Sequence, residues 1–125
     1  MSARVASIAG DITDLAAVHQ AIRDNVDGVF HLAAIVSANA EEDFDLGIRV
    51  NLEGTRNVLE ACRALPQPAH LVFASSVAVY GGDMPEVLDD GTILTPQTSY
   101  GVQKAIGELL LNDYNVEILA QFTSD

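Results

Sequence analysis

The sequence predicts an α/β fold built on a parallel sheet, and two observations support this prediction. Strand-like and helix-like segments alternate three times along the 125 residues, which is the pattern of α/β domains. The predicted strands are continuous apolar runs, as expected for parallel strands that are covered on both faces. The length allows one domain at most, so we expect a single doubly wound sheet within residues 1–125.

The first strand and helix are predicted at residues 4–9 and 14–25. Apolar side chains fill most of the strand. Thr13 or Asp14 suits the helix N-cap, since its side-chain oxygen can accept a hydrogen bond from a backbone N–H of the first turn. Apolar residues recur at helical spacing and predict one buried face: Leu15, Val18, Ile22 and Val26.

The second and third strands are predicted at residues 29–34 and 70–76, and their helices at residues 51–65 and 99–114. Both strands are short apolar runs bounded by turn-forming residues. The acidic stretch at residues 38–45 is predicted to be a loop or a helix entrance. No internal repeat or low-complexity tract interrupts this order.

Composition excludes several functional classes. A net charge of -12 argues against binding to nucleic acid or to an anionic membrane, because both surfaces repel it. No apolar run approaches the roughly 20 residues of a membrane span, and the N-terminus lacks the apolar core of a secretion signal. The single cysteine, Cys62, excludes an internal disulfide and suits a reducing compartment. We therefore expect a cytoplasmic protein.

Three side chains point to acid–base chemistry at a hydroxyl group. Tyr100 and Lys104 are four positions apart on a predicted helix, so they share one face about 5–6 Å apart at Cβ. Ser76 ends the third predicted strand, and ligands of open α/β sheets gather beyond the carboxyl ends of strands. A free tyrosine has a pKa of about 10, and a neighbouring ammonium favours the phenolate that a general base needs.

Other readings of these residues stay open. A Tyr-x-x-x-Lys pattern alone also fits a surface helix with a solvated lysine. Ser75 is either a second substrate contact or a strand-end hydroxyl. The three histidines lack metal-ligand spacing, and we expect no metal site. Gly101 and Gly107 lie inside a predicted helix, where glycine is unfavourable relative to alanine, so close packing or a cofactor is expected there.

Five stretches, in one order along the chain, resemble the short-chain dehydrogenase/reductase superfamily. More narrowly, the chain resembles its extended branch, which contains NAD-dependent sugar epimerases and dehydratases and has a Rossmann-like fold. The stretches are Gly10-Asp11-Ile12-Thr13-Asp14, His31-Leu32-Ala33-Ala34, the segment 51–61, Ser75-Ser76-Val77-Ala78-Val79-Tyr80-Gly81 and Tyr100-Gly101-Val102-Gln103-Lys104.

The resemblance implies a role for each matching residue. The catalytic residues would be Ser76, Tyr100 and Lys104, and the substrate would contact Ser75, Ser76 and Tyr100. The cofactor is NAD, with NADP as the alternative. Its implied contacts are Asp11, Ile12, Leu32, Ala33, Ala34, Asn51, Ala74, Tyr100 and Lys104.

The resemblance also implies an activity. The segments 94–100 and 107–114 are most similar to those of dehydrogenases of the D-erythronate type, which oxidise a secondary hydroxyl of a sugar acid. Dehydratases carry an acidic pair where Val77-Ala78 stand here, which disfavours dehydration. The alternatives are a nucleotide-sugar 4-epimerase and a non-catalytic remnant that cannot bind cofactor alone. Relatives pair through helices matching residues 51–65 and 99–114, so a homodimer is possible.

The resemblance has gaps at both ends. The family binds pyrophosphate at a helix N-terminus that follows a glycine-rich turn, and the 125 residues contain no such turn. Residues 115–125 do not continue the family pattern. We therefore expect an incomplete NAD(P)-binding domain. In the strand order 3-2-1-4-5-6, residues 4–9 lack their neighbours at positions 2 and 1. That strand either docks beside residues 29–34 or needs another chain.

Overall fold

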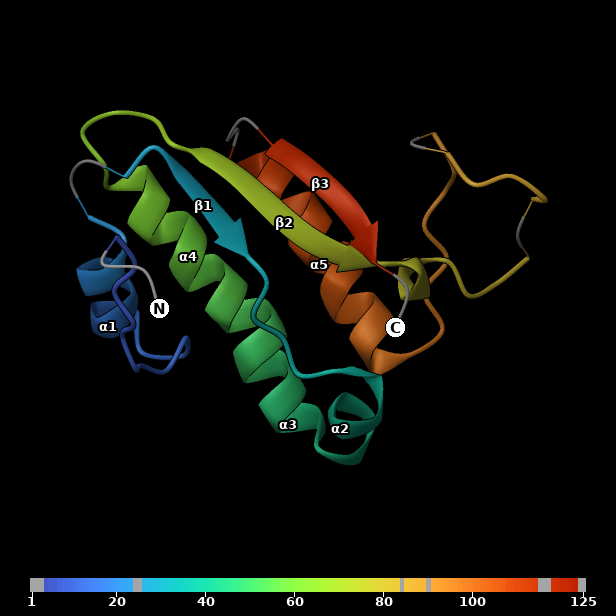
Figure 1. Ribbon diagram of the computed structural model, residues 1–125. Coiled ribbons are helices and arrows are strands. Elements are labelled where there is room, and N and C mark those ends of the chain that lie inside the picture. The colour runs from blue at the N-terminus through green and yellow to red at the C-terminus, as the bar shows by residue number, and fades with distance from the viewer. Residues whose placement is uncertain (1–3, 24–25, 84, 90, 115–117, 124–125) are drawn as a thin grey trace.

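The computed structural model describes residues 4–23, 26–83, 85–89, 91–114 and 118–123, the last stretch as backbone only. Helices and strands alternate in it, as the sequence predicts (Figure 1). In chain order the elements are α1 (Leu15–Ala21), β1 (Gly28–His31), α2 (Ser37–Glu42), α3 (Phe44–Gly47), the π-helix η1 (Ile48–Glu53), α4 (Gly54–Arg63), β2 (His70–Ser76), the 3-10 turn η2 (Val77–Val79), α5 (Ser99–Asp113) and β3 (Ile118–Thr123).

The described strands form one parallel sheet in the order β1-β2-β3. Val29 lies opposite Leu71 in the β1–β2 pair, and Phe73 lies opposite Ala120 in the β2–β3 pair. Parallel neighbours that are joined by helices are the defining feature of α/β folds. The predicted fold class is therefore confirmed.

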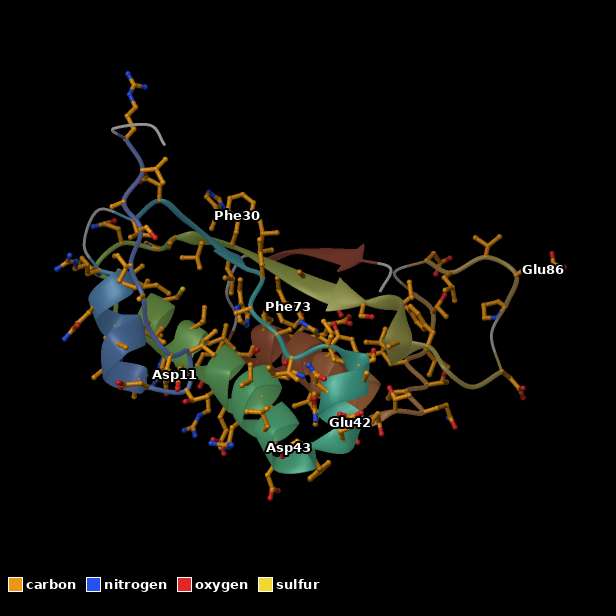
Figure 2. The ribbon with its side chains drawn as sticks, turned by 60° about the horizontal axis from the view of Figure 1, so that its bottom comes forward. Asp11, Phe30, Glu42, Asp43, Phe73 and Glu86 are labelled. Atoms are coloured by element: carbon orange, nitrogen blue, oxygen red, sulfur yellow. The ribbon has the colours of Figure 1, made fainter. Side chains whose placement is uncertain are left out.

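Helices α4 and α5 cover one face of the sheet and enclose the main apolar core (Figure 1). The core residues are Val18, Val58, Leu59, Ala61, Cys62, Leu71, Phe73 and Leu111. Phe73 projects from β2 toward these helices and is fully buried, whereas Phe30 of β1 lies on the opposite face and is 73% exposed (Figure 2). The sheet was expected to be covered on both faces. Among the described residues, only the face toward α4 and α5 is covered.

The strand predicted at residues 4–9 is wrong. Residues 5–10 form no helix or strand, and they leave Val5 and Ile8 more than half exposed. A strand is held by hydrogen bonds to a neighbouring strand. Sheet pairing in the described residues begins with β1 and β2, so an apolar run without a partner has no ladder to join. It did not dock beside β1.

Three other boundaries differ from the predictions. Residues 115–125 were expected to leave the family pattern, but β3 (Ile118–Thr123) pairs in parallel with β2. Strand β1 ends at His31, so residues 32–34 form a loop. The helix predicted at 51–65 starts earlier, because α3, η1 and α4 follow one another without a break from Phe44 to Arg63. Residues 24–25, at the predicted end of α1, lie outside the described residues.

Glycines allow α5 to lie very close to β2 and η2. A Cβ on Gly101 would overlap the carbonyl oxygen of Ala78, and a Cβ on Gly107 would stand 2.8 Å from the ring of Phe73. A backbone carbonyl cannot move aside as a flexible side chain can. Close packing therefore explains both glycines, and it sets the position of the first turn of α5.

One result about membranes comes from the same residues. In the part of the chain that the structure describes, no helix combines the length and the apolar character that a membrane span requires.

We predict that Gly101→Ala destabilises the protein by about 1–3 kcal/mol, the usual cost of overpacking. Alanine is otherwise the better helix former, so a loss of stability isolates the clash with Ala78. Gly10→Ala is the matched control, because its added Cβ would have its nearest neighbour 3.9 Å away. Urea unfolding followed by circular dichroism measures both variants. Equal stability of Gly101→Ala and the native chain would contradict the close approach.

Candidate functional site

The packing of α5 on β2 buries the three residues predicted to be catalytic. Ser76, the last residue of β2, is fully buried, and Tyr100 and Lys104 on α5 are 4% and 3% exposed. The Ser76 hydroxyl oxygen accepts a hydrogen bond from the backbone N–H of Ala78 and so caps η2. Because Gly101 abuts Ala78, the first turn of α5 lies against the turn that follows Ser76.

Lys104 is a buried cation with a defined environment. Its Nζ donates to the carbonyl oxygen of Ala74 at 2.8 Å. The same atom lies 4.7 Å from the centre of the Phe73 ring and 5.8 Å from the centre of the Tyr100 ring. A carbonyl dipole and aromatic faces both stabilise a desolvated ammonium. These contacts hold the charge of Lys104 beside the tyrosine ring.

Ser75 faces the helices. Its hydroxyl donates to the carboxylate of Glu108 on α5 at 2.7 Å. Burial raises the pKa of Glu108, and the hydrogen bond from Ser75 opposes that rise. Ser75 is 1% exposed and lies on the same face of β2 as Leu71 and Phe73. This geometry favours the reading of Ser75 as a strand-end hydroxyl that ties β2 to α5.

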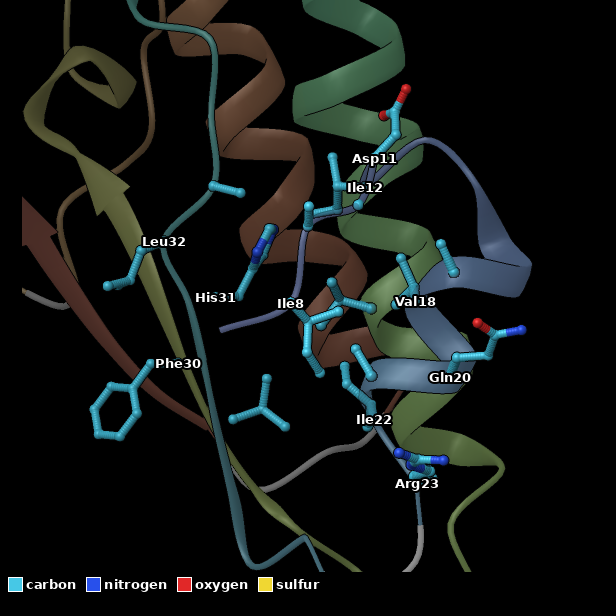
Figure 3. A pocket seen from close by; sticks show the side chains of 17 residues that line it. Ile8, Asp11, Ile12, Val18, Gln20, Ile22, Arg23, Phe30, His31 and Leu32 are labelled. Atoms are coloured by element: carbon cyan, nitrogen blue, oxygen red, sulfur yellow. The ribbon is translucent and has the colours of Figure 1, made fainter. Parts of the chain in front are cut away.

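Residues expected at the cofactor line a pocket of about 590 Å³ beside β1 (Figure 3). Asp11, Ile12, Leu32 and Ala33 are among its walls, with α1 on the far side. The walls are mostly apolar. Asp11 accepts hydrogen bonds from the backbone N–H and the hydroxyl of Thr13, and these bonds lower the pKa of its carboxyl. The structure thus gathers four of the expected cofactor residues around one cavity.

His31 connects this pocket with the buried site. It lines the pocket, is 4% exposed, and its ring centre lies 5.6 Å from that of Phe73. Burial, assisted by the charge of Lys104, lowers the pKa of His31 to about 4. Its Nε2 lies 2.8 Å from the hydroxyl of Thr55. Because that hydroxyl donates its proton to the backbone oxygen of Asn51, it accepts from His31, which fixes the tautomer with hydrogen on Nε2.

The remaining expected cofactor residues lie elsewhere. Ala34 is outside the pocket lining, and the carbonyl of Ala74 is the acceptor for Lys104. Asn51 is 2% exposed, and its side chain bonds to the backbone of Ile35 and to Gln103. The structure therefore separates the expected set into a pocket group and a β2–α5 group, with Ala34 in the loop after β1 and Asn51 in η1.

Four polar residues near the site were not predicted from sequence. Glu108 and Thr55 bond to Ser75 and His31, Gln103 bonds to Asn51, and Glu41 accepts from the backbone N–H of Ser99 at 2.5 Å. Glu41 lies in the acidic stretch 38–45, which was predicted to be a loop or a helix entrance. Gln103 gave a weak signal in the sequence, because it lies three positions after Tyr100 and four before Gly107 on one face of the predicted helix, and a buried amide needs a partner. The partners themselves are distant in sequence.

No group of three or more histidine, cysteine, aspartate or glutamate side chains that could hold a metal ion occurs among the residues whose placement is described.

A model of the NAD dependent epimerase/dehydratase family matches residues 2–124. Two relatives share the name D-erythronate dehydrogenase. The protein from Cupriavidus necator is 58% identical over 113 residues, which are 90% of this chain and 35% of that protein. The protein from Haemophilus influenzae is 51% identical over 94 residues, 75% of this chain and 30% of that protein. The chain thus spans about a third of the length of these relatives.

Solved structures are similar in the same way. A nucleoside-diphosphate-sugar epimerase from Agrobacterium tumefaciens superposes with a TM-score of 0.78 at 38% identity, covering 98% of this chain and 39% of that one. The UDP-glucose 4-epimerase from Brucella ovis, solved in complex with NAD, superposes with a TM-score of 0.79 at 28% identity. That match covers 92% of this chain and 37% of the epimerase.

We predict that His31 makes stability depend on pH in one window. The pKa of His31 is about 4 when folded against 6.5 when unfolded, so the unfolded state binds more protons between these values. Stability is therefore full above pH 6.5 and falls as the pH drops toward 4, by about 3 kcal/mol at 1.36 kcal/mol per pKa unit. His31→Gln should lack this part of the slope. Denaturant unfolding at pH 4, 5, 6 and 7 compares the two proteins, and parallel curves would refute the assignment.

Proposed function

The chain belongs to the NAD-dependent epimerase/dehydratase family, and we propose that it carries the catalytic side chains of an NAD-dependent oxidoreductase. The proposed reaction is oxidation of a secondary hydroxyl of a sugar acid of the D-erythronate type. The observation that carries the proposal is that Ser76 at the end of β2 and Tyr100 and Lys104 on α5 are all buried, with Lys104 Nζ 5.8 Å from the centre of the Tyr100 ring. The two relatives named D-erythronate dehydrogenase support the substrate class.

The pocket beside β1 fits the adenosine half of the cofactor. Its apolar walls suit a flat heterocycle, and the Asp11 carboxylate at the wall can accept hydrogen bonds from an amine or from ribose hydroxyls. Leu32 and Ala33 would lie against the same moiety. The sequence contains no glycine-rich turn for the pyrophosphate. We propose that residues 1–125 form an incomplete NAD(P)-binding Rossmann-like domain, with NAD as cofactor and NADP as the alternative.

Ser76 and Tyr100 act on the substrate oxygen in this proposal. The Ser76 hydroxyl donates a hydrogen bond to the substrate hydroxyl oxygen and fixes its direction. The phenolate of Tyr100 accepts the proton from that hydroxyl as the carbonyl forms. The chemistry that a bound nicotinamide supplies is acceptance of hydride from the carbon that bears the oxygen. Burial of both residues keeps competing water away from the oxygen.

Lys104 supports Tyr100 electrostatically. Its ammonium lies 5.8 Å from the centre of the Tyr100 ring and is shielded from solvent, so its field is weakly screened there. A positive charge at that distance favours the phenolate over the phenol. The side chain reaches the carbonyl of Ala74, and a ribose hydroxyl is the alternative acceptor for the same donor when the cofactor binds.

Two alternative functions are each supported by a specific observation. A nucleotide-sugar 4-epimerase is favoured by the 38% identity to the epimerase from Agrobacterium tumefaciens, although the 58% identity to D-erythronate dehydrogenase is higher. A non-catalytic remnant is favoured by the lack of a glycine-rich turn. Product analysis with sugar acids and nucleotide sugars separates the two enzymes, and cofactor binding separates both from the remnant.

A homodimer through the helices is part of the same proposal. Val102 and Leu109 on α5 are 41% and 60% exposed, although apolar residues on a helix of a monomer normally face its core. A second copy that packs against α5 would cover them. Light scattering of the purified chain measures this association directly.

We predict that Tyr100→Phe lowers turnover of a sugar acid by about 10²–10⁴-fold, the usual contribution of a general base. The affinity for NAD should stay within a few-fold, because the phenyl ring keeps the packing of Tyr100 and only the hydroxyl is lost. NADH absorbance follows turnover. Tyr114→Phe, at the end of α5, is the matched control. Full turnover in Tyr100→Phe would overturn the assignment of the base.

We predict that the 125-residue chain binds NAD more weakly than a complete family member but measurably, because the adenosine pocket is present without a pyrophosphate-binding turn. Calorimetric titration measures the dissociation constant, and Asp11→Asn should weaken it about ten-fold, as expected for a charge-assisted hydrogen bond. Undetectable binding at millimolar NAD would favour the remnant.

A further inference from the structure

A series of hydrogen bonds between buried polar groups connects β1 to α5 through η1 and the first turn of α4. His31 Nε2 donates to the Thr55 hydroxyl at 2.8 Å, and that hydroxyl donates to the backbone oxygen of Asn51 at 2.8 Å. Asn51 Nδ2 then donates to Gln103 Oε1 at 2.7 Å. All four side chains are at most 4% exposed. Gln103 immediately precedes Lys104 on α5, so the chain ends next to the proposed catalytic residues.

Asn51 is the branch point of this chain. Its Nδ2 also donates to the backbone oxygen of Ile35 at 2.9 Å, and its Oδ1 accepts from the backbone N–H of Ile35 at 2.8 Å. Both amide hydrogens and the oxygen are thus engaged inside the protein. Ile35 belongs to the loop that leaves β1 through Leu32 and Ala33, two walls of the pocket. Asn51 therefore connects the pocket loop to α5 and has no hydrogen left to donate to a ligand.

Two local features of the backbone accommodate this arrangement, a π-helical turn at Asn51 and a glycine at position 47. In η1, which contains Asn51, the turn is wider than in an α-helix, and the N–H of Gly54 bonds to Arg49 five residues back. Such π-helical turns are rare and frequently lie at functional sites. On the other side, a Cβ on Gly47 would stand 2.8 Å from Gln103 Nε2. Glycine at this position leaves the room through which the Gln103 side chain reaches Asn51.

Gln103 carries a cost that an apolar residue would avoid. Its Nε2 is buried and makes no hydrogen bond within the part of the chain that the structure describes. Exchanging the oxygen and nitrogen of the amide would bring two donors together at Asn51, so the orientation is fixed by the network. An unpaired buried donor is destabilising, whereas a leucine of similar size is not. The bond from Asn51 to Oε1 is the one interaction that explains a glutamine here.

We propose that Gln103 is a positioning residue which, through Asn51, couples the pocket loop at residues 32–35 to α5. The coupling fixes where Tyr100 and Lys104 stand relative to the walls of the pocket. The functional interpretation of this coupling rests on the proposed function, since Leu32 and Ala33 line the proposed cofactor pocket and α5 carries the proposed general base. The coupling itself is a property of the apo protein.

Amide hydrogen exchange, measured by NMR on the 125-residue chain, tests the coupling. Gln103→Leu keeps the volume and removes the acceptor. We expect the backbone N–H of Ile35 and the side-chain amide of Asn51 to exchange roughly five-fold faster or more, about the factor that one hydrogen bond is worth. Amides of Leu71 and Phe73 in the core of β2 should change much less. The matched control is Gln67→Leu in the exposed turn between α4 and β2, which should change neither.

A second variant distinguishes a loss of this coupling from a general loss of stability. Gly47→Ala leaves Gln103 in the sequence but places a Cβ where its amide lies, so it should also accelerate exchange at Ile35. The proposal is overturned if either variant accelerates all core amides equally, since that describes a purely structural glutamine. Unchanged exchange at Ile35 overturns it as well.

Adding NAD to the same samples separates this inference from the proposed function. In the native chain we expect NAD to shift the resonances of both Ile35 and Lys104, and in Gln103→Leu to shift Ile35 while the shift at Lys104 shrinks. An undiminished shift at Lys104 counts against the coupling. If NAD shifts no resonance of the native chain, the proposed function fails, and the exchange comparison still decides whether Gln103 couples the loop to the helix.

Discussion

The packing of α5 on β2 is the contact on which the rest of the site depends. It is held at three successive positions of the strand: Phe73 fits against Gly107, Ala74 accepts from Lys104, and Ser75 donates to Glu108. Each contact constrains the same displacement of the helix along the strand. A helix held in this way presents Tyr100 at one position along β2, which no single contact would fix.

Buried polar groups make this packing specific at a cost in stability. Lys104 is desolvated, and Gln103 Nε2 is buried without a hydrogen-bond partner among the described residues. An apolar core of the same shape would avoid both costs. Polar partners, however, bond only in one arrangement. The neutral His31, with its tautomer fixed by Thr55, is part of that arrangement, because a second donor on its ring would need a new acceptor.

Local signals in the sequence predicted the elements that carry the site. The bounds of β2 were predicted as 70–76, because a short apolar run is bounded there by turn-forming residues. The helix predicted at 99–114 is α5, which the structure bounds at Ser99–Asp113 with Thr98 as its N-cap. The bonds between Asn51 and Gln103 or Ser75 and Glu108 were not predictable. The two residues of each pair are 52 and 33 positions apart. Residue spacing predicts side-chain contacts only within a few helical turns.

The failed strand at residues 4–9 and the exposed face of β1 have one physical cause. An apolar run becomes a strand only where another strand completes its hydrogen bonds, and propensity is a weak substitute for that partner. Strand β1 is an edge strand of the described sheet and pairs only with β2. The exposed face of β1 that bears Phe30 and the apolar pocket beside β1 both lie at this edge of the sheet. The core on the helical face of the sheet is built mainly from β2, α4 and α5, and the partly buried Val29 of β1 packs against it. The proposed acid–base residues therefore lie on β2 and α5, away from the unpaired edge of β1. The proposed adenosine pocket lies beside that edge.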